Sequence, residues 1–295
     1  MEKINWYPGH MKKTRELIQQ NMKMVDLVIE VIDSRIPVSS RNPILPDLIA
    51  DKPEIIVLNK KDLSDKKETD AWKRHLTRGN VTAISADCES GEGVKRLLDE
   101  LTKFNENRNS AKKWDRPLRM MIVGVPNVGK SSLINRLTKR KAAKTGDKPG
   151  VTKGKQWLTL ENGMQLLDTP GILWPNIEDP EQGRHLAFCG SIKDEIYDIS
   201  DLCLEFIKFM LSEHREELYA RYKLKEPDDP DLYCSDEFTP VSENGEYTPL
   251  GAMEQIARNR GFIMPGKRID YERCARTVLD EFRSGTIGRI TIERA

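Results

Sequence analysis

The sequence predicts an α/β domain with a mostly parallel sheet, followed by a smaller all-helical domain. Short apolar runs alternate with amphipathic stretches over the first half of the chain, as in a parallel sheet covered by helices on both faces. Beyond Gly171 the apolar residues recur at helical spacing only. We therefore expect the α/β domain over 1–177, with an N-terminal helix included, and the helical domain over 178–295, with an acidic loop at 226–250.

The elements of the first domain follow from this alternation. Residues 34–43 contain two prolines and are expected to be irregular, and 109–116 reads as a short basic linker. The later residues 226–250 combine four prolines with many acids, which is typical of an exposed loop. Strands are expected at 26–33, 54–60, 81–86, 117–125, 155–160 and 164–168, and helices at 11–24, 65–78, 91–108, 130–139, 251–261 and 270–285.

Composition excludes several classes of protein. The chain has 38% hydrophobic and 32% charged residues, as globular proteins do, and no apolar run approaches the roughly 20 residues of a membrane span. The N-terminus lacks the apolar core of a signal peptide, and the five scattered cysteines indicate free thiols in a reducing compartment. We expect a cytoplasmic protein with no membrane partner, monomeric when free.

The net charge of +1 hides a strong asymmetry along the chain. Residues 1–177 carry 32 Lys and Arg against 22 Asp and Glu, whereas 178–250 carry 7 against 19 and 251–295 carry 9 against 6. Such segregation indicates that the basic part of the chain, residues 1–177, binds a polyanion. Chance differences between solvated faces are the alternative.

The segment Gly124–Ser131 (GVPNVGKS) matches G-x-x-x-x-G-K-[ST] between an expected strand and an expected helix. In that setting backbone N–H groups wrap phosphates, and Lys130 reaches the β- and γ-phosphates. Ser131 is expected to offer its hydroxyl to Mg²⁺. The expected nucleotide-binding residues here are Asn127, Val128, Gly129, Lys130, Ser131 and Ser132.

Two further segments fit the γ-phosphate side of such a site. Asp168 ends an expected strand in "LLDTPG" and is placed to hold Mg²⁺ through water. Gly171 would offer its N–H to the γ-phosphate, and the Thr152 hydroxyl would reach Mg²⁺ from a Gly- and Lys-rich segment. On its own, Asp168–Gly171 reads as an ordinary Pro-Gly turn; next to the phosphate loop it reads as a nucleotide sensor.

The stretch Asn59–Asp62 (NKKD) follows an apolar strand. The Asp62 carboxylate would accept from guanine N1–H and the 2-amino group, and adenine would leave it unpaired. Asn59 would bridge to the base N7 and brace the phosphate loop, and the Lys60 stem would cover the ring. Ser85 and Ala86 end the next strand, and the Ala86 N–H is expected to meet guanine O6. Alone, N-K-x-D is a weak pattern typical of solvated loops.

All parts of a GTP site are thus present, but the base-reading segments precede the phosphate loop. This order is physically permissible because ligands bind at the carboxyl ends of parallel strands, whose order in space is what matters. Such an order arises when the original N- and C-termini of a domain are joined and the chain is opened elsewhere. This join is feasible because the termini of a domain often lie close together. The sequence therefore predicts a circularly permuted P-loop GTPase domain, with 91–116 as the join.

The chain resembles the YlqF-type family of circularly permuted GTPases over nearly its whole length. The resemblance rests on "WYPGHM", "VIDSRIP", "NKKDL", "GVPNVGKSSLIN", "PGVTKG", "LLDTPGIL" and "RTVLDEFRSGTIGRITIE". It implies a factor that assembles the large ribosomal subunit, with GTP hydrolysis triggered on the particle. The partners implied are GTP and GDP, rRNA and a large-subunit precursor. The stretch 226–250 looks longer than the family pattern.

Hydrolysis by the free protein is expected to be slow. Ile172 follows "DTPG", where other GTPases carry a water-orienting Gln. His10 in "YPGHM" is our candidate for placing the water, in line with the resemblance; a solvent-exposed or helix-capping His is the alternative. Asn127 resembles the residue through which K⁺-dependent GTPases bind a monovalent cation. Lys130, Thr152 and Gly171 complete the expected catalytic set.

Contact with RNA is expected through basic patches, because backbone phosphates attract them. Two rival hypotheses remain: a signalling-type GTPase switch that acts on a protein effector without RNA, and a nucleotide-gated scaffold with negligible hydrolysis. The expected patches comprise Lys12, Lys13 and Arg15, the run from Lys139 to Lys155, and Arg258, Arg260, Lys267, Arg268, Arg273 and Arg276.

Overall fold

The computed structural model divides the chain into two compact units, residues 1–186 with 291–295, and residues 187–290. The boundary lies further along than the one expected after residue 177, and the last five residues belong to the first unit. The structure describes residues 16, 19–49, 52–112, 116–139, 156–168, 177, 179–227, 241–242 and 245–295.

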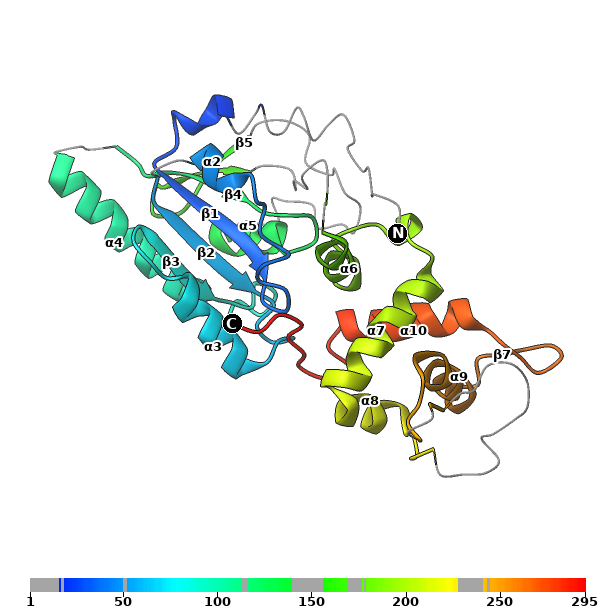
Figure 1. The fold of residues 1–295 in the computed structure, drawn as a ribbon. Coiled ribbons are helices and arrows are strands. Elements are labelled where there is room, and N and C mark those ends of the chain that lie inside the picture. The colour runs from blue at the N-terminus through cyan, green and yellow to red at the C-terminus, as the bar shows by residue number, and fades with distance from the viewer. Residues whose placement is uncertain are drawn as a thin grey trace. The chain divides into compact units, whose positions relative to one another are not determined.

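A six-stranded sheet forms the centre of the first unit, in the order β3-β2-β1-β4-β6-β5 (Figure 1). All neighbouring strands run parallel except β5, which is antiparallel to β6. This confirms the mostly parallel sheet. The strands are β1 (Leu27–Asp33), β2 (Glu54–Asn59), β3 (Val81–Ser85), β4 (Arg119–Val123), β5 (Gln156–Thr159) and β6 (Gln165–Asp168).

The helices of this unit begin and end close to the expected residues. In α3 the Asp65 side chain caps the first turn by accepting the Glu68 N–H. The long helix α4 continues into the expected basic linker, and the short α2 occupies part of the chain that the sequence left unassigned. Of the expected N-terminal helix, residues 16 and 19–22 are described and helical. The bounds are α2 (Leu45–Ile49), α3 (Lys66–Leu76), α4 (Val94–Lys112), α5 (Lys130–Thr138) and α6 (Pro180–Phe188).

The sheet is buried on both faces. Every residue of β1 is buried, and because its side chains alternate between the two faces, both faces of this strand are covered. On one face Val28 packs with α2 residues, and Ile32 packs with Trp72 and Leu76 of α3 in a second cluster. The alternate side chains Ile29 and Val31 are buried on the opposite face. Apolar side chains fill most of both faces, with the buried Glu30 of β1 as an exception, and the motif residues lie at the strand ends.

Asp26, just before β1, holds the connection from α4 to β4. Its carboxylate accepts from Arg108 at 2.6 Å and from two nitrogens of Arg116 at 2.7 and 2.9 Å. It also accepts the Arg119 N–H that starts β4. The join required by the permuted strand order is therefore fixed by one carboxylate with two arginine partners.

In the described part of the second unit, the Phe206 ring packs against Phe282 and Phe188, with centroid distances of 4.7 and 5.4 Å. A two-stranded hairpin, β7 (Ile263–Met264) and β8 (Arg268–Ile269), interrupts the expected all-helical pattern. Its strands are too short to show an alternating apolar pattern. The helices are α7 (Ile199–Glu213), α8 (Arg215–Tyr222), α9 (Pro249–Arg260) and α10 (Tyr271–Arg283), with a 3₁₀ turn at Asp194–Ile196.

None of the helices in the described ranges is both long enough and apolar enough to cross a membrane.

Glu30 is a charged residue in the middle of the central strand. Its carboxylate accepts from Arg41 Nε at 2.7 Å, and Arg41 also reaches Glu54 at 3.4 Å. Burial is the main cause that raises the pKa of Glu30 from 4.5 to about 7, with Glu54 adding to it and Arg41 opposing it. Between pH 4.5 and about 7, the Glu30 carboxyl is therefore protonated in the folded protein but ionised in the unfolded chain.

This gives a prediction for stability against pH. A raised carboxyl pKa contributes stability below the unfolded value of 4.5, and that stability is lost as the pH rises through about 7. The isosteric change Glu30→Gln removes the titration, so wild type should lose roughly 1–3 kcal/mol relative to the variant over this range. Urea unfolding at several pH values measures it. Glu106→Gln, on the exposed side of α4, is the matched control; parallel curves for wild type and Glu30→Gln would contradict the assignment.

Candidate functional site

The carboxyl ends of the parallel strands bring the expected motifs to one edge of the sheet. Asp33 at the end of β1 is in register with Asn59 at the end of β2. On the other side of β1, Asp168 at the end of β6 is in register with Ile122 of β4, just before the phosphate loop Gly124–Ser131. The permuted chain order thus gives the strand arrangement that one GTP site needs.

The phosphate loop curls tightly against β1. Gly124 has a φ of 150°, and a Cβ built on it would lie 2.3 Å from the Val31 carbonyl oxygen, so only glycine fits. The buried Lys130 folds its Nζ back onto the Gly124 and Val125 carbonyl oxygens, at 3.0 and 2.7 Å. These bonds hold the ammonium group over the loop, where a phosphate would lie.

Helix α5 begins directly after Gly129, which has a left-handed φ of 96°. No side chain caps the helix start, so its first N–H groups face the concave loop and suit an anion. Val128 is buried, Ser131 and Ser132 are partly buried, and Asn127 is exposed with a φ of 60°. His10, Thr152 and Gly171 lie outside the described residues, as does the side chain of Asp168.

Asn59 ties three segments of the site together. Its Nδ2 donates to the Val128 carbonyl oxygen of the phosphate loop at 2.7 Å, and its Oδ1 accepts the Cys88 N–H at 2.9 Å. Asn59 is buried, and both ends of its amide are satisfied. The expected bracing of the phosphate loop by Asn59 is therefore present in the geometry.

The base-reading loop Asn59–Asp62 leaves β2 through Lys60, which has a left-handed φ of 59°. Its Nζ lies 2.9 Å from Asp33, a completely buried carboxylate that Arg35 also grips. Burial alone would raise the pKa of Asp33, but Arg35 and Lys60 together hold it below its usual value. The Lys60 stem is thereby fixed at the edge where the base would lie.

Asp62 is exposed at the rim of the site, where a ligand can reach its carboxylate. Partial burial raises its pKa, with Asp87 and Glu89 adding to the effect. A guanine base would offer this carboxylate two N–H donors in place of water.

The expected contact of Ala86 with guanine O6 is not supported by the geometry. Ala86 is buried, and its N–H donates to the Leu58 carbonyl oxygen at 2.8 Å within the sheet. The partly buried Ser85 is likewise a strand residue, in register with Leu58. Although β3 itself ends at Ser85, its backbone pairing with β2 includes the Ala86 N–H, so this donor is already occupied.

The turn after β3, residues 87–91, faces the base-reading loop instead. Asn59 holds the Cys88 N–H, and Arg136 of α5 donates to the carbonyl oxygens of Cys88 (3.3 Å) and Glu89. Burial raises the pKa of the Cys88 thiol to about 12, so it stays neutral. Sequence reasoning missed Cys88 and Arg136 because Cys88 takes part through its backbone, and the Arg136 guanidinium donates to backbone oxygens that any residue type would present.

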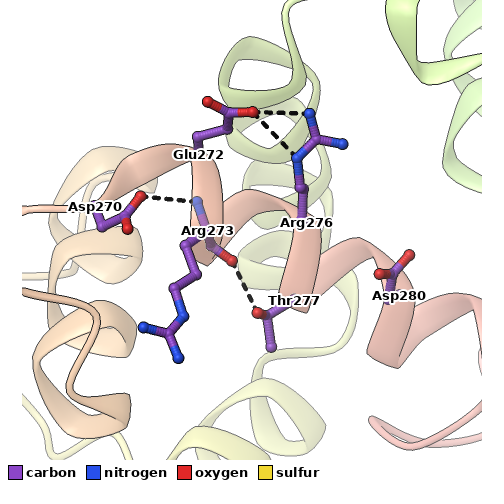
Figure 2. A pocket seen from close by; sticks show the side chains of 6 residues that line it. All are labelled: Asp270, Glu272, Arg273, Arg276, Thr277 and Asp280. Carbon is purple, nitrogen blue, oxygen red and sulfur yellow. Dashed lines mark hydrogen bonds and ion pairs between the residues drawn. The ribbon is translucent and has the colours of Figure 1, made fainter.

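The basic residues expected to meet RNA divide into two groups in the second unit. Arg276 pairs with Glu272 at 2.8 Å, and Arg260 pairs with Glu281 and lies over the Tyr222 ring. Arg276 and Glu272 border a pocket of about 350 Å³ along α10. Asp270 and Asp280 also line it (Figure 2). This pocket has mixed charge and does not favour a polyanion. The other exposed basic residues of the expected patch are Arg258 on α9, Lys267 and Arg268 on the hairpin, and Arg273 on α10, whose guanidinium lies over the Phe262 ring.

The fold and this site define a circularly permuted P-loop GTPase. A family described as "50S ribosome-binding GTPase" matches residues 119–228. Ribosome biogenesis GTPase A from Priestia megaterium is 40% identical, covering 98% of this chain and 96% of its own length. Mitochondrial ribosome-associated GTPase 1 from Bos taurus is 34% identical, with 98% and 88% covered. GNP-bound YlqF from T. maritima superposes with a TM-score of 0.63 at 30% identity, with 96% and 98% covered.

The chain belongs to the ribosome biogenesis GTPase A (YlqF-type) family, and it is a GTPase.

The Asn59 bridge gives a sharp prediction for Gly129→Ala. A Cβ at Gly129 would lie 2.1 Å from Asn59 Nδ2, so the change breaks the link between the base and phosphate loops. We expect GDP affinity to fall by at least about tenfold, as the loss of a bridging hydrogen bond at a binding site does. Gly163→Ala is the control, since Gly163 also has a positive φ of 80° but no atom within 4 Å. Equal GDP affinity of the two variants would contradict the bridge; equilibrium titration measures it.

Proposed function

We propose that the chain is a GTP-hydrolysing assembly factor for the large ribosomal subunit that binds rRNA or pre-ribosomal particles in a nucleotide-dependent way. The observation that carries the proposal is the Asn59 amide, which joins a phosphate loop to a guanine-type base loop in one buried bridge. The printed names of the relatives supply the ribosomal part of the proposal.

The chain's own residues divide the chemistry of hydrolysis between them. Lys130 and the uncapped start of α5 neutralise phosphate charge. Ser131 at the first turn of α5 suits Mg²⁺, with Thr152 and, through water, Asp168 as the further ligands we propose. Bound Mg²⁺ supplies charge stabilisation at the β- and γ-phosphates. Gly171 is proposed to sense the γ-phosphate, and Asn127 to bind K⁺ near the same oxygens.

Guanine recognition is the best-supported half of the site. Lys60 is fixed by Asp33 beneath the base position, and Asp62 is open to the ligand. Lacking a side-chain donor at Ile172, the free protein should turn over slowly, so we propose that the particle completes the catalytic arrangement and that His10 places the water. We further propose a cytoplasmic, monomeric free protein.

The first test is turnover and co-sedimentation with large-subunit precursors. We expect binding to depend on whether GDP or a non-hydrolysable GTP analogue is present, and GTP turnover to rise at least about tenfold with particles, because a positioned water contributes strongly to hydrolysis. His10→Ala should keep GTP affinity and lose the stimulation, and KCl should support faster turnover than NaCl.

Each outcome of this test discriminates between functions. No co-sedimentation in either nucleotide state, together with no stimulation of turnover, would favour the alternative, a signalling-type switch that acts on a protein effector without RNA. An unchanged stimulated rate in His10→Ala would exclude that residue as the water-positioning group. Equal rates in the two salts would exclude the K⁺ site at Asn127.

The base specificity has its own test in Asp62→Asn. An amide can donate to the exocyclic oxygen of xanthine, whereas a carboxylate repels it. Preference should therefore shift from GTP towards xanthosine triphosphate, by about 100-fold or more in the ratio of affinities, since hydrogen-bond mismatches discriminate strongly. Competition binding measures the ratio. A variant that still prefers guanine would show that Asp62 does not read the base.

A further inference from the structure

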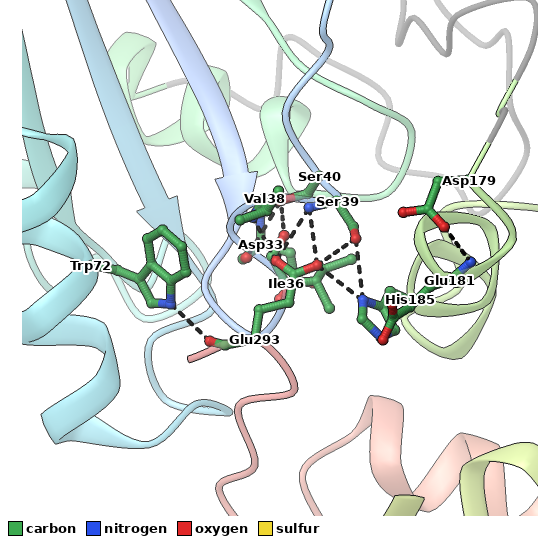
Figure 3. A network of polar contacts seen from close by, with 10 residues as sticks. All are labelled: Asp33, Ile36, Val38, Ser39, Ser40, Trp72, Asp179, Glu181, His185 and Glu293. Carbon is green, nitrogen blue, oxygen red and sulfur yellow. Dashed lines mark hydrogen bonds and ion pairs between the residues drawn. The ribbon is translucent and has the colours of Figure 1, made fainter. Parts of the chain in front are cut away.

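The last residues of the chain hold two loops of the first unit. The Glu293 carboxylate accepts the N–H groups of Val38 and Ser39 and the Ser39 hydroxyl, and its Oε1 lies 2.9 Å from Nδ1 of His185 (Figure 3). The Glu293 side chain is only 11% exposed. A carboxylate with this many charge-assisted partners is firmly positioned.

The backbone on both sides of this carboxylate is also fixed. The Glu293 carbonyl oxygen accepts from Trp72 Nε1 at 2.7 Å (Figure 3), and the Ile292 N–H donates to the Arg35 carbonyl oxygen at 2.8 Å. The buried Thr291 accepts the Asp65 N–H at 2.9 Å. The segment Thr291–Glu293 therefore bridges loop 34–41, which follows β1, and residue 65, which closes the loop after β2.

These two anchor points flank the base-reading loop. Arg35, whose carbonyl is held by Ile292, grips Asp33 with Nε at 2.9 Å and Nη2 at 2.8 Å. Asp33 in turn holds Lys60, while Asp65 lies three residues beyond the base-reading Asp62. The contacts form a continuous path from Ile292 through Arg35 and Asp33 to the base-reading loop.

We propose that Thr291–Glu293 is a positioning element of the guanine site: it fixes the loops on either side of Asn59–Asp62, so that Lys60 and Asp62 are held ready for the base. The contacts of the segment are with protein groups: loop 34–41, Asp65, Trp72 and His185. The proposal rests on the guanine-nucleotide binding proposed above. It assigns to the chain end a role in guanine selectivity, which neither the phosphate loop nor the base motif reveals.

The test is Glu293→Gln in the full-length protein. The amide keeps the size of the side chain but replaces one acceptor oxygen with a donor, which faces the N–H groups of loop 34–41. Dissociation of a methylanthraniloyl-GDP probe, followed by stopped-flow fluorescence, should become about tenfold faster. The preference for GDP over inosine diphosphate, which lacks the 2-amino group, should narrow because Asp62 is less firmly placed.

Two further variants separate positioning from general stability. Thr291→Val removes only the hydroxyl that accepts from Asp65, and it should narrow the GDP-to-inosine-diphosphate ratio even if Glu293→Gln folds poorly. Glu106→Gln, an exposed change on α4, should alter neither the dissociation rate nor the ratio. A variant that melts earlier but keeps the wild-type ratio would reveal a purely structural role.

The outcomes also separate this proposal from the proposed function. Unchanged dissociation and selectivity in both tail variants, with normal GDP binding by the wild type, would overturn the positioning role alone. A wild-type protein that does not bind the GDP probe would overturn both proposals.

Discussion

The site depends on one buried primary amide. Asn59 stands at the end of β2 and joins the phosphate loop to the turn after β3 through its two polar atoms. Leaving either polar atom of this buried amide without a partner would cost folding free energy. The end of β2, the phosphate loop and the turn after β3 are therefore fixed together. Because the bridge spans strands on both sides of the permutation join, it couples the two halves that the altered chain order separates. The base end and the phosphate end therefore form one site.

Much of this arrangement follows from the sequence. Apolar strands with motifs at their carboxyl ends require a parallel sheet that gathers those motifs, and the observed register brings Asp33, Asn59 and Asp168 to the expected edge. The phosphate loop could be recognised from the sequence because phosphate binding depends on the residue types themselves, the glycines and Lys130. The hairpin β7–β8 could not be predicted from the sequence, because strands of two residues are too short to show an alternating apolar pattern.

The misassigned contact shows where motif reading stops. Ser85-Ala86 resembles a base-contacting pair, yet strand pairing uses the Ala86 N–H. The turn that reaches the site is instead held by Asn59 and Arg136 through backbone atoms of Cys88 and Glu89. Likewise, the sequence of residues 289–293 (RITIE) does not predict their contact with residues 35–39. Hydrogen bonds between residues so far apart in the chain leave no local sequence pattern. Such features depend on tertiary geometry rather than on residue type.

The tail also has a consequence for how the protein is made. The hydrogen bond between Ser39 and Glu293 joins residues 254 positions apart. Contacts of such high sequence separation form late in folding, because the entropy cost of closing the long loop precedes the favourable contacts. During synthesis the strands, the phosphate loop and the whole of residues 187–290 emerge before this contact is available. A chain released early thus has its motifs but an unfinished first unit. The loops on either side of Asn59–Asp62 are therefore held completely only once residues 291–293 have emerged.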